Sequence, residues 1–355
     1  MGIVYGGRSG EHEISVTSAG SIFKHIDRQR YEPVAIRIEK DGRWTLPDQP
    51  PMALTAAEVI QQAKSAAAKS QALGGGEPAV LTALKLDVVF PVLHGPYGED
   101  GTIQGLLELA NIAYVGAGVL ASAAGMDKSA MKMMFAARAL PVGMWRAFVR
   151  PEWDRDRALV RKGLETLGYP VFVKPANLGS SVGISKVKTD ADLVPAIEMA
   201  FEYDRKVIVE AAVPNPREIE CSVLGNDDPE ASLPGEIIPS REFYDYEAKY
   251  LDDDSKTVIP AQLAPDVVKT IQRLSIEAFR AIDCTGLARV DFLLSRDTGE
   301  AVLNEINTMP GFTSISMYSK MWEASGVPYS ELVHRLIQLG LERHSQKQKL
   351  KTSFV

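Results

Sequence analysis

The sequence has little cysteine and no long apolar run, and each shortage excludes a class of protein. Two cysteines in 355 residues cannot form the dense disulfide framework of a small secreted domain. Cys221 and Cys284 lie in apolar stretches, so we expect both to be small core residues. No segment approaches the roughly 20 apolar residues of a membrane-spanning helix. We therefore predict no membrane partner.

Positive charge is also scarce. The chain has 39 lysines and arginines against 46 aspartates and glutamates, a formal net charge of -7. Nucleic acids and membrane surfaces are polyanionic, so an acidic chain binds either poorly, and we predict no nucleic-acid partner. Residues 1–7 lack the basic and apolar regions of a signal peptide. We therefore expect a cytoplasmic location.

The chain is long enough for two or three domains, each with its own core. A short apolar strand at 3–5 leads through a glycine pair to a helix from Glu13. Residues 86–90 form a nearly continuous apolar run, which is typical of parallel sheets. These patterns predict an N-terminal α/β domain over residues 1–117.

After residue 117 the pattern changes to helices and short strands. We expect a helix at 126–140, strands at 171–174 and 207–210, and a second domain boundary near 211. Later strands are expected at 219–224, 288–294 and 301–306, and later helices at 265–282 and 329–344. The predicted division is 1–117, 118–211, 212–345 and a tail at 346–355.

Acidic and amide side chains recur at a spacing of two late in the chain. Arg289 and Asp291 share one face of a predicted strand, and so do Glu305 and Asn307. Two such strands side by side would present the oxygen ligands that Mg²⁺ prefers. The alternative is a solvated face of an antiparallel pair. The apolar neighbours of both pairs argue against a peripheral position, so we predict that Asp291, Glu305 and Asn307 bind metal.

Four cations come from separate segments: Lys128, Lys174, Lys249 and Arg289. Together they could balance the charge of a triphosphate, although a single lysine is more often a surface residue. The loop 179–183 consists mainly of small residues, which allow backbone N–H groups to approach a phosphate. It lacks the ending of a Walker A loop, and on its own it fits an ordinary turn as well.

Glu210 ends an apolar strand and is followed by Ala211, Ala212 and Val213. The segment is similar to those that hold the edge of an adenine by backbone groups. The alternative is an ordinary strand end.

Together these features resemble the ATP-grasp family, and within it the D-alanine–D-alanine ligases. The segments that carry the resemblance are 6–15, 94–101, 174–183, 244–250, 289–291 and 304–313. They keep the family's order and span nearly the whole chain. The resemblance implies an ATP-grasp fold preceded by a parallel-sheet N-terminal domain.

The resemblance also implies a reaction. The γ-phosphate of ATP would pass to the carboxylate of a first D-alanine, and the amine of a second D-alanine would attack the acyl phosphate. The product, D-alanyl-D-alanine, would serve peptidoglycan synthesis. The resemblance further implies that the protein is a homodimer, that it uses ATP, and that it binds two Mg²⁺ or Mn²⁺ ions.

Site residues follow from the same resemblance. The catalytic residues would be Glu11, Ser180, Tyr250, Arg289 and Gly311. The residues that bind the amino-acid substrates would be His94, Ser316 and Met317. The ATP-binding residues would be Lys128, Lys174, Ser181, Glu210, Ala211, Val213, Glu218, Lys249 and Asn304.

Two alternatives stay open. A D-alanine–D-lactate ligase would lack the sequence Tyr-Glu-Ala-Lys-Tyr, which this chain retains at residues 246–250. A non-catalytic ATP-binding module on the same fold would be expected to have lost Arg289 or the metal ligands, and none of these is lost.

Overall fold

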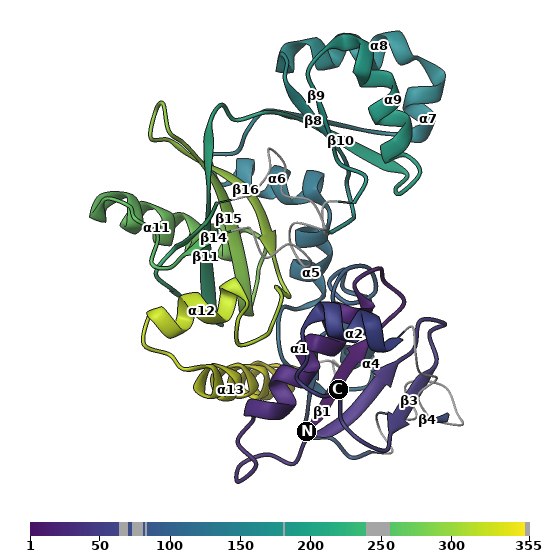
Figure 1. Ribbon diagram of the computed structural model, residues 1–355, viewed down its shortest axis with the longest axis vertical. Coiled ribbons are helices and arrows are strands. Elements are labelled where there is room, and N and C mark those ends of the chain that lie inside the picture. The colour runs from purple at the N-terminus through teal and green to yellow at the C-terminus, as the bar shows by residue number, and fades with distance from the viewer. Residues whose placement is uncertain (64–69, 73–80, 82–83, 180–181, 239–255, 352–355) are drawn as a thin grey trace.

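The structure, a computed structural model, describes residues 1–63, 70–72, 81, 84–179, 182–238 and 256–351. The described strands form three sheets, which follow one another along the chain. In Figure 1 the N-terminal sheet runs from purple to blue, the central sheet is teal, and the C-terminal sheet runs from green to yellow-green. Among the described helices, none has the length and apolar character that spanning a bilayer requires.

The N-terminal sheet has the strand order β4-β3-β2-β1-β5-β6. Its strands are β1 (Gly2–Gly6), β2 (Val34–Ile38), β3 (Trp44–Pro47), β4 (Ser70–Ala72), β5 (Val88–Pro91) and β6 (Ala113–Tyr114). Strands β2, β1, β5 and β6 are neighbours in that order and pair in parallel, and β3 and β4 are added antiparallel at the β2 edge. The helices of this region are α1 (His12–His25), α2 (Ala56–Ala63) and α4 (Thr102–Leu109). The parallel centre agrees with the predicted α/β class.

The central sheet is antiparallel, in the order β7-β10-β8-β9. Its strands are β7 (Trp145–Val149), β8 (Val171–Pro175), β9 (Ser185–Val187) and β10 (Lys206–Ala211). The nearby helical elements are α7 (Arg150–Arg155), α8 (Arg157–Leu164), η1 (Glu165–Leu167) and α9 (Asp190–Ala200). Val173 and Val209 pack with Ile197 in one apolar cluster. Because strand side chains alternate, Lys174 and Glu210 belong to the opposite face.

The C-terminal sheet has the order β14-β13-β11-β15-β16, and β12 pairs with β11. Its strands are β11 (Pro216–Gly225), β12 (Glu230–Ala231), β13 (Gly235–Ile238), β14 (Lys256–Val258), β15 (Gly286–Ser295) and β16 (Ala301–Asn307). Helix α11 (Pro265–Ala281) covers one face with Ile271 and Leu274, which are buried with Cys221 and Cys284. Both cysteines are free and buried, as predicted.

The helix expected at 126–140 is divided. The chain forms α5 (Val119–Met126) and α6 (Lys128–Ala137), with Asp127 between them in an extended conformation. The Asp127 carboxylate accepts hydrogen bonds from the backbone N–H groups of Ser129 (3.1 Å) and Ala130 (3.0 Å). The prediction was wrong here because it followed apolar periodicity through a residue that acts as an N-cap.

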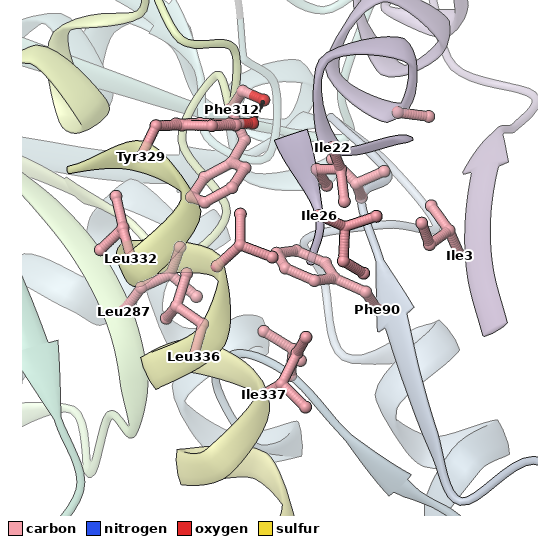
Figure 2. Packing of buried hydrophobic residues seen from close by; sticks show 14 of the residues in the cluster. Ile3, Ile22, Ile26, Phe90, Leu287, Phe312, Tyr329, Leu332, Leu336 and Ile337 are labelled. Atoms are coloured by element: carbon pink, nitrogen blue, oxygen red, sulfur yellow. Dashed lines mark hydrogen bonds between the residues drawn. The ribbon is translucent and has the colours of Figure 1, made fainter. Parts of the chain in front are cut away.

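One apolar core joins the two ends of the chain. The last helix, α13 (Tyr329–Gln348), returns to β5 and β6 of the N-terminal sheet, while α12 (Met317–Ala324) packs against α13 and β11. Figure 2 shows Phe90 and Ile22 facing Phe312, Leu336 and Ile337. The rings of Phe90 and Phe312 are 5.4 Å apart between centroids. Each such side chain contributes about 1.5–3 kcal/mol when fully buried.

Helix α13 extends beyond the predicted helix end and into the range 346–355 that the sequence analysis assigned to a tail. The division into 1–117, 118–211, 212–345 and 346–355 stays a prediction.

A single arginine of α13 ties the N-terminal and C-terminal regions together. Arg343 donates to the carbonyl of Gly116, to Thr285 Oγ1 (2.6 Å) and to the carbonyl of Tyr114 (3.0 Å). Its guanidinium carbon lies 4.2 Å from the centre of the Tyr114 ring. The backbones meet closely here, because a Cβ on Gly286 would lie 3.0 Å from the Cα of Gly116.

We expect Arg343→Met to lower the free energy of unfolding by about 2–4 kcal/mol, because it leaves carbonyl groups without their charged donor. Lys347→Met is the matched control on the same helix. Lys347 pairs with Glu108 at an exposed position, and such pairs contribute about 1 kcal/mol or less. Urea denaturation measures both variants, and equal losses would contradict the role given to Arg343.

Candidate active site

Acidic side chains form a row across three neighbouring strands of the C-terminal sheet. In the strand register Asp291 of β15 pairs with Glu220 of β11 on one side and with Glu305 of β16 on the other. In the next row Arg289 pairs with Asn307. Paired residues share a face of the sheet, so the register brings together the four side chains that the sequence singled out. Glu220 is a fifth member that the sequence analysis missed.

The two carboxylate oxygens of Asp291 are held by an arginine. Arg289 donates from Nε to Asp291 Oδ1 and from Nη2 to Asp291 Oδ2, both at 2.7 Å. The same Nε lies 3.1 Å from Glu220 Oε2. Burial alone would lower the pKa of Arg289, but the charges of Asp291 and Glu220 raise it well above its usual value. One cation therefore offsets part of the negative charge of this row, which has three carboxylates.

This row and the next one also offer oxygen ligands of the type that a divalent cation requires. Asn307 Nδ2 donates to Asp291 Oδ2 at 3.0 Å, which leaves the Asn307 amide oxygen able to act as a ligand. Two carboxylates and an amide oxygen match the hard donor set of Mg²⁺. Among the described residues, no group of three or more His, Cys, Asp or Glu side chains is placed to hold a metal ion. The predicted metal site is not such a group, because only two of its three ligands, Asp291 and Glu305, are of these types.

A bulge in β16 turns a further predicted residue toward this region. Asp291 pairs with Glu305 and Phe292 pairs with Leu303, so Asn304 has no partner in the register. A bulge interrupts the alternation of side chains. Leu303 is buried, whereas Asn304 and Glu305 are both partly exposed. Strict alternation would have placed Asn304 and Glu305 on opposite faces.

On the central sheet one carboxylate lies between two lysines. Glu210 Oε2 is 2.5 Å from Lys174 Nζ, and Glu210 Oε1 is 2.9 Å from Lys132 Nζ. Burial alone would raise the pKa of Glu210, but the charges of Lys132 and Lys174 lower it to about 2. Burial would likewise lower the pKa of Lys174, yet Glu210 raises it. The carboxylate is therefore ionised at neutral pH.

Lys132 was not among the predicted site residues. It lies four residues after Lys128 on α6, so both side chains share one helical face. Both are buried, with relative exposures of 3% for Lys132 and 9% for Lys128. The spacing was visible in the sequence, but burial is what separates these lysines from surface ones.

Lys128 connects the segment just before the small-residue loop 179–183 with the acidic row. Its Nζ donates to the carbonyl of Leu178 at 2.7 Å and lies 3.9 Å from Glu305 Oε2. Its backbone N–H donates to the carbonyl of Ala176 at 3.0 Å. The structure thus brings Lys128, Lys174 and Arg289 to one region between the central and C-terminal sheets.

The loops after the parallel strands β1 and β5 meet at Glu11. These strands are neighbours, so their carboxyl ends open at the same edge of the sheet. A Cβ added to Gly95 would lie 2.5 Å from Glu11 Oε2, and one added to Gly179 would lie 3.2 Å away. Gly95 also has a φ of +73°. Glycine at both positions leaves room for the carboxylate between three separate segments.

His94 is buried beside Glu11 rather than open to solvent, with 3% of its surface exposed. Its Nε2 is 3.0 Å from Ser18 Oγ, and its Nδ1 is 3.1 Å from the carbonyl oxygen of Met309. Glu99 Oε1 lies 3.8 Å from Nδ1. Burial alone would lower the pKa of His94, but Glu99 raises it above the usual value.

The loop that follows β16 is fastened to α1. Ser18 Oγ accepts from the backbone N–H of Phe312 at 3.3 Å, and Ser21 Oγ accepts from that of Ser314 at 3.0 Å. This loop contains Gly311 and ends at Ser316, whose hydroxyl accepts from the N–H of Thr313 at 3.0 Å. Helix α1 therefore positions this loop near Glu11.

The other predicted residues are placed as follows. Met317 begins α12, and its methyl group packs closely against Gly235 of β13. Ala211 ends β10 and donates to the carbonyl of Met144 at 3.0 Å, and Val213 follows in the connecting segment. Glu218 lies on β11, two residues before Glu220. Four predicted residues lie outside the described ranges: Ser180, Ser181, Lys249 and Tyr250.

Two family descriptions match the chain. Residues 1–117 match the D-ala D-ala ligase N-terminus, and residues 134–338 match the D-ala D-ala ligase C-terminus. The chain belongs to the D-alanine–D-alanine ligase family. The resemblance predicted from the sequence is confirmed.

Relatives of this ligase family match over nearly the whole chain. A D-alanine--D-alanine ligase of Heliobacterium modesticaldum is 52% identical over 98% of this chain and 96% of its own length. One from Bacillus cytotoxicus is 48% identical over 99% of this chain and 98% of its own length.

Solved structures of the family have the same architecture. The D-alanine-D-alanine ligase from Coxiella burnetii gives a TM-score of 0.81 at 39% identity, over 98% of this chain and 95% of that chain. VanG D-Ala:D-Ser ligase from Enterococcus faecalis gives 0.81 at 34% identity, over 96% and 98%. The Bacillus anthracis D-alanine--D-alanine ligase complexed with ATP gives 0.75 at 25% identity, over 98% of both chains. The ATP-grasp fold is thereby confirmed.

We expect Glu99→Gln to change stability in a pH-dependent way, with the amide oxygen still accepting from the Gly95 N–H that Glu99 binds at 2.8 Å. In the wild type the folded pKa of His94 is raised above 6.5. The stability gained from its protonation is therefore present below 6.5 and is lost as the pH rises through the folded value.

The free energy of unfolding of the wild type minus that of Glu99→Gln, measured from about pH 5.5 to 9, should decline with rising pH. Glu331→Gln removes an exposed ion pair to Arg335 and should give a flat difference. A flat difference for Glu99→Gln as well would show that Glu99 does not set the protonation of His94.

Proposed function

We propose that this chain uses ATP to join two D-alanines into D-alanyl-D-alanine, releasing ADP and phosphate. The observation that carries the proposal is the position of two clusters of charged side chains. Glu11 lies buried where three loops meet, and the row around Arg289 and Asp291 faces Lys128 and Lys174. The first group suits an amino-acid ammonium and the second suits a nucleotide triphosphate.

Activation of the first substrate is the chemical problem. A carboxylate is a poor electrophile, so one of its oxygens attacks the γ-phosphorus of ATP and the bond to ADP breaks. The amine of the second D-alanine then forms a bond to the carbonyl carbon, phosphate leaves with the oxygen, and the nitrogen loses its proton. We assign Lys128 and Lys174, with Lys249 and Ser181, to the phosphates, where they offset developing charge.

The chain's own groups bind and orient the reactants. Glu11 holds the ammonium of the first D-alanine, with Ser180 and Tyr250 completing its hydrogen bonds and His94 beside it. Arg289 and the Gly311 N–H stabilise the tetrahedral oxyanion. Ser316 and Met317 form the place for the second substrate, next to the loop that α1 holds.

The nucleotide's base and ribose are assigned to the strand end at β10 and to β11. The residues proposed to contact them are Glu210, Ala211, Val213, Glu218 and Asn304. The ionised Glu210 carboxylate favours a donor such as an amino group and repels phosphate.

We further propose that Asp291, Glu305 and Asn307 hold two Mg²⁺ or Mn²⁺ ions. Bound there, the metal would neutralise phosphate charge and favour in-line transfer. Arg289 binds both oxygens of Asp291, and a carboxylate has about four lone-pair sites, so a metal ion could bind Asp291 with Arg289 still in place. A homodimer, a cytoplasmic location and service to peptidoglycan synthesis complete the proposal.

The decisive assay is phosphate release from ATP that depends on added D-alanine, with the product identified by mass spectrometry. Arms with D-lactate and D-serine as second substrate test the related products, and the similarity to VanG D-Ala:D-Ser ligase makes the second arm necessary. We expect dipeptide from D-alanine. Binding of ATP without phosphate release in the presence of any of these substrates would favour the non-catalytic module. A preference for the ester or for the D-serine product would replace the proposed substrate.

We expect Glu305→Gln to lower turnover by at least about 100-fold, because it removes a charged ligand from the acidic row. Glu300→Gln, an exposed position just before β16, is the control and should retain activity. Thermal melting establishes that both variants fold. Near-normal turnover of folded Glu305→Gln at saturating Mg²⁺ would contradict the metal assignment.

A further inference from the structure

Lys132 gives the central part of the site more positive charge than its ion pairs require. Lys174 alone would neutralise Glu210, since the two groups are 2.5 Å apart. Lys132 nevertheless approaches the other carboxylate oxygen, with only 4% of its side chain exposed. A buried charge is costly unless it is paired. One carboxylate between two ammonium groups gives these three residues a net charge of +1, and the further carboxylates that act on Lys174 are Glu305 and Glu218.

The geometry at Glu210 indicates a vacant acceptor direction. Lys132 Nζ lies 2.9 Å from Oε1 and hydrogen-bonds to the carboxylate, but a carboxylate oxygen has two lone pairs, so this contact uses only one of them. The other lone pair therefore stays available to a ligand. A phosphate has no donor to offer, whereas an amino group on a base does.

The two lysines also restrict how the carboxylate can turn. Lys174 comes from β8 and Lys132 from α6, and they pair with different oxygens of Glu210. With one partner the carboxylate could rotate about its terminal torsion, which is soft. With a partner on each oxygen its plane is fixed by two separate elements.

We propose that Lys132 is a positioning residue for nucleotide selection: it orients the Glu210 carboxylate so that Oε1 accepts an N–H from the adenine amino group. A purine with a carbonyl oxygen at that position offers no donor and meets a negative charge. Lys132 thus sets the preference for adenine over hypoxanthine without touching the base. This inference rests on the proposed use of ATP.

The test compares ADP with IDP, which differ in the amino and carbonyl groups at this position. Isothermal titration calorimetry on the full chain gives both affinities without turnover, and D-alanine-dependent phosphate release with ATP and ITP gives the kinetic counterpart. We expect Lys132→Met to reduce the ADP to IDP affinity ratio by about tenfold or more, the value of one hydrogen bond to a charged group. Turnover at saturating ATP should change little.

Three further variants separate positioning from packing and from charge. Lys132→Arg keeps the charge and should retain the selectivity, and Lys162→Met removes a charge from an exposed position on α8 and should leave the ratio unchanged. In a Glu210→Gln background, Lys132→Met should have no further effect on the ratio. If Lys132→Met does not fold, Lys132→Gln replaces it.

An unchanged ratio in a folded Lys132 variant would overturn the inference, as would equal weakening of ADP and IDP. Failure of the proposed function is a different result: wild-type protein would bind ADP but show no D-alanine-dependent phosphate release. In that case the affinity ratio would still decide whether Lys132 controls the choice of base.

Discussion

Like charges on adjacent strands are the constraint around which the site is built. The register aligns Glu220, Asp291 and Glu305 across three strands, and neighbouring carboxylates destabilise a sheet unless a cation lies between them. Arg289 supplies that cation, holding Asp291 through two hydrogen bonds. The proposed metal ions would bring further positive charge to the same row.

The opposite side of the site has the reverse balance. There Lys132 and Lys174 surround the single carboxylate of Glu210, and Lys128 reaches across toward Glu305. A nucleotide placed between the two sheets would meet cations from the central part and oxygen ligands from the C-terminal part. The separation of charge would also orient it, because Glu210 would repel the phosphates while Lys128 and Arg289 would attract them.

Helix α1 and helix α13 position the loops of the proposed substrate site relative to the proposed nucleotide site. Glu11 precedes α1, and Ser18 and Ser21 on the same helix fasten the loop that contains Gly311. Arg343 of α13 fastens the segment 114–116 to Thr285. Because the chain's two ends share one core (Figure 2), a shift of either helix would move the proposed ammonium anchor relative to the proposed oxyanion donors.

Local pattern was sufficient for much of this protein. Period-two spacing placed Arg289 with Asp291 and Glu305 with Asn307 on shared faces, and continuous apolar runs indicated the parallel sheet. These features depend on the backbone geometry of single strands, so the sequence carries them directly. Family motifs then indicated the fold and the reaction, while the individual site roles stay predictions.

Tertiary structure decided what depends on pairing between distant segments. The bulge at Asn304 follows from the register of β16 against β15, and Glu220 enters the row only because β11 lies beside β15. Lys132 has a sequence signal, its position four residues after Lys128, but only packing against Glu210 separates it from a surface lysine. Alternation and helical spacing are local, whereas register and burial arise from contacts between segments far apart in the chain, and these cannot be read from either segment alone.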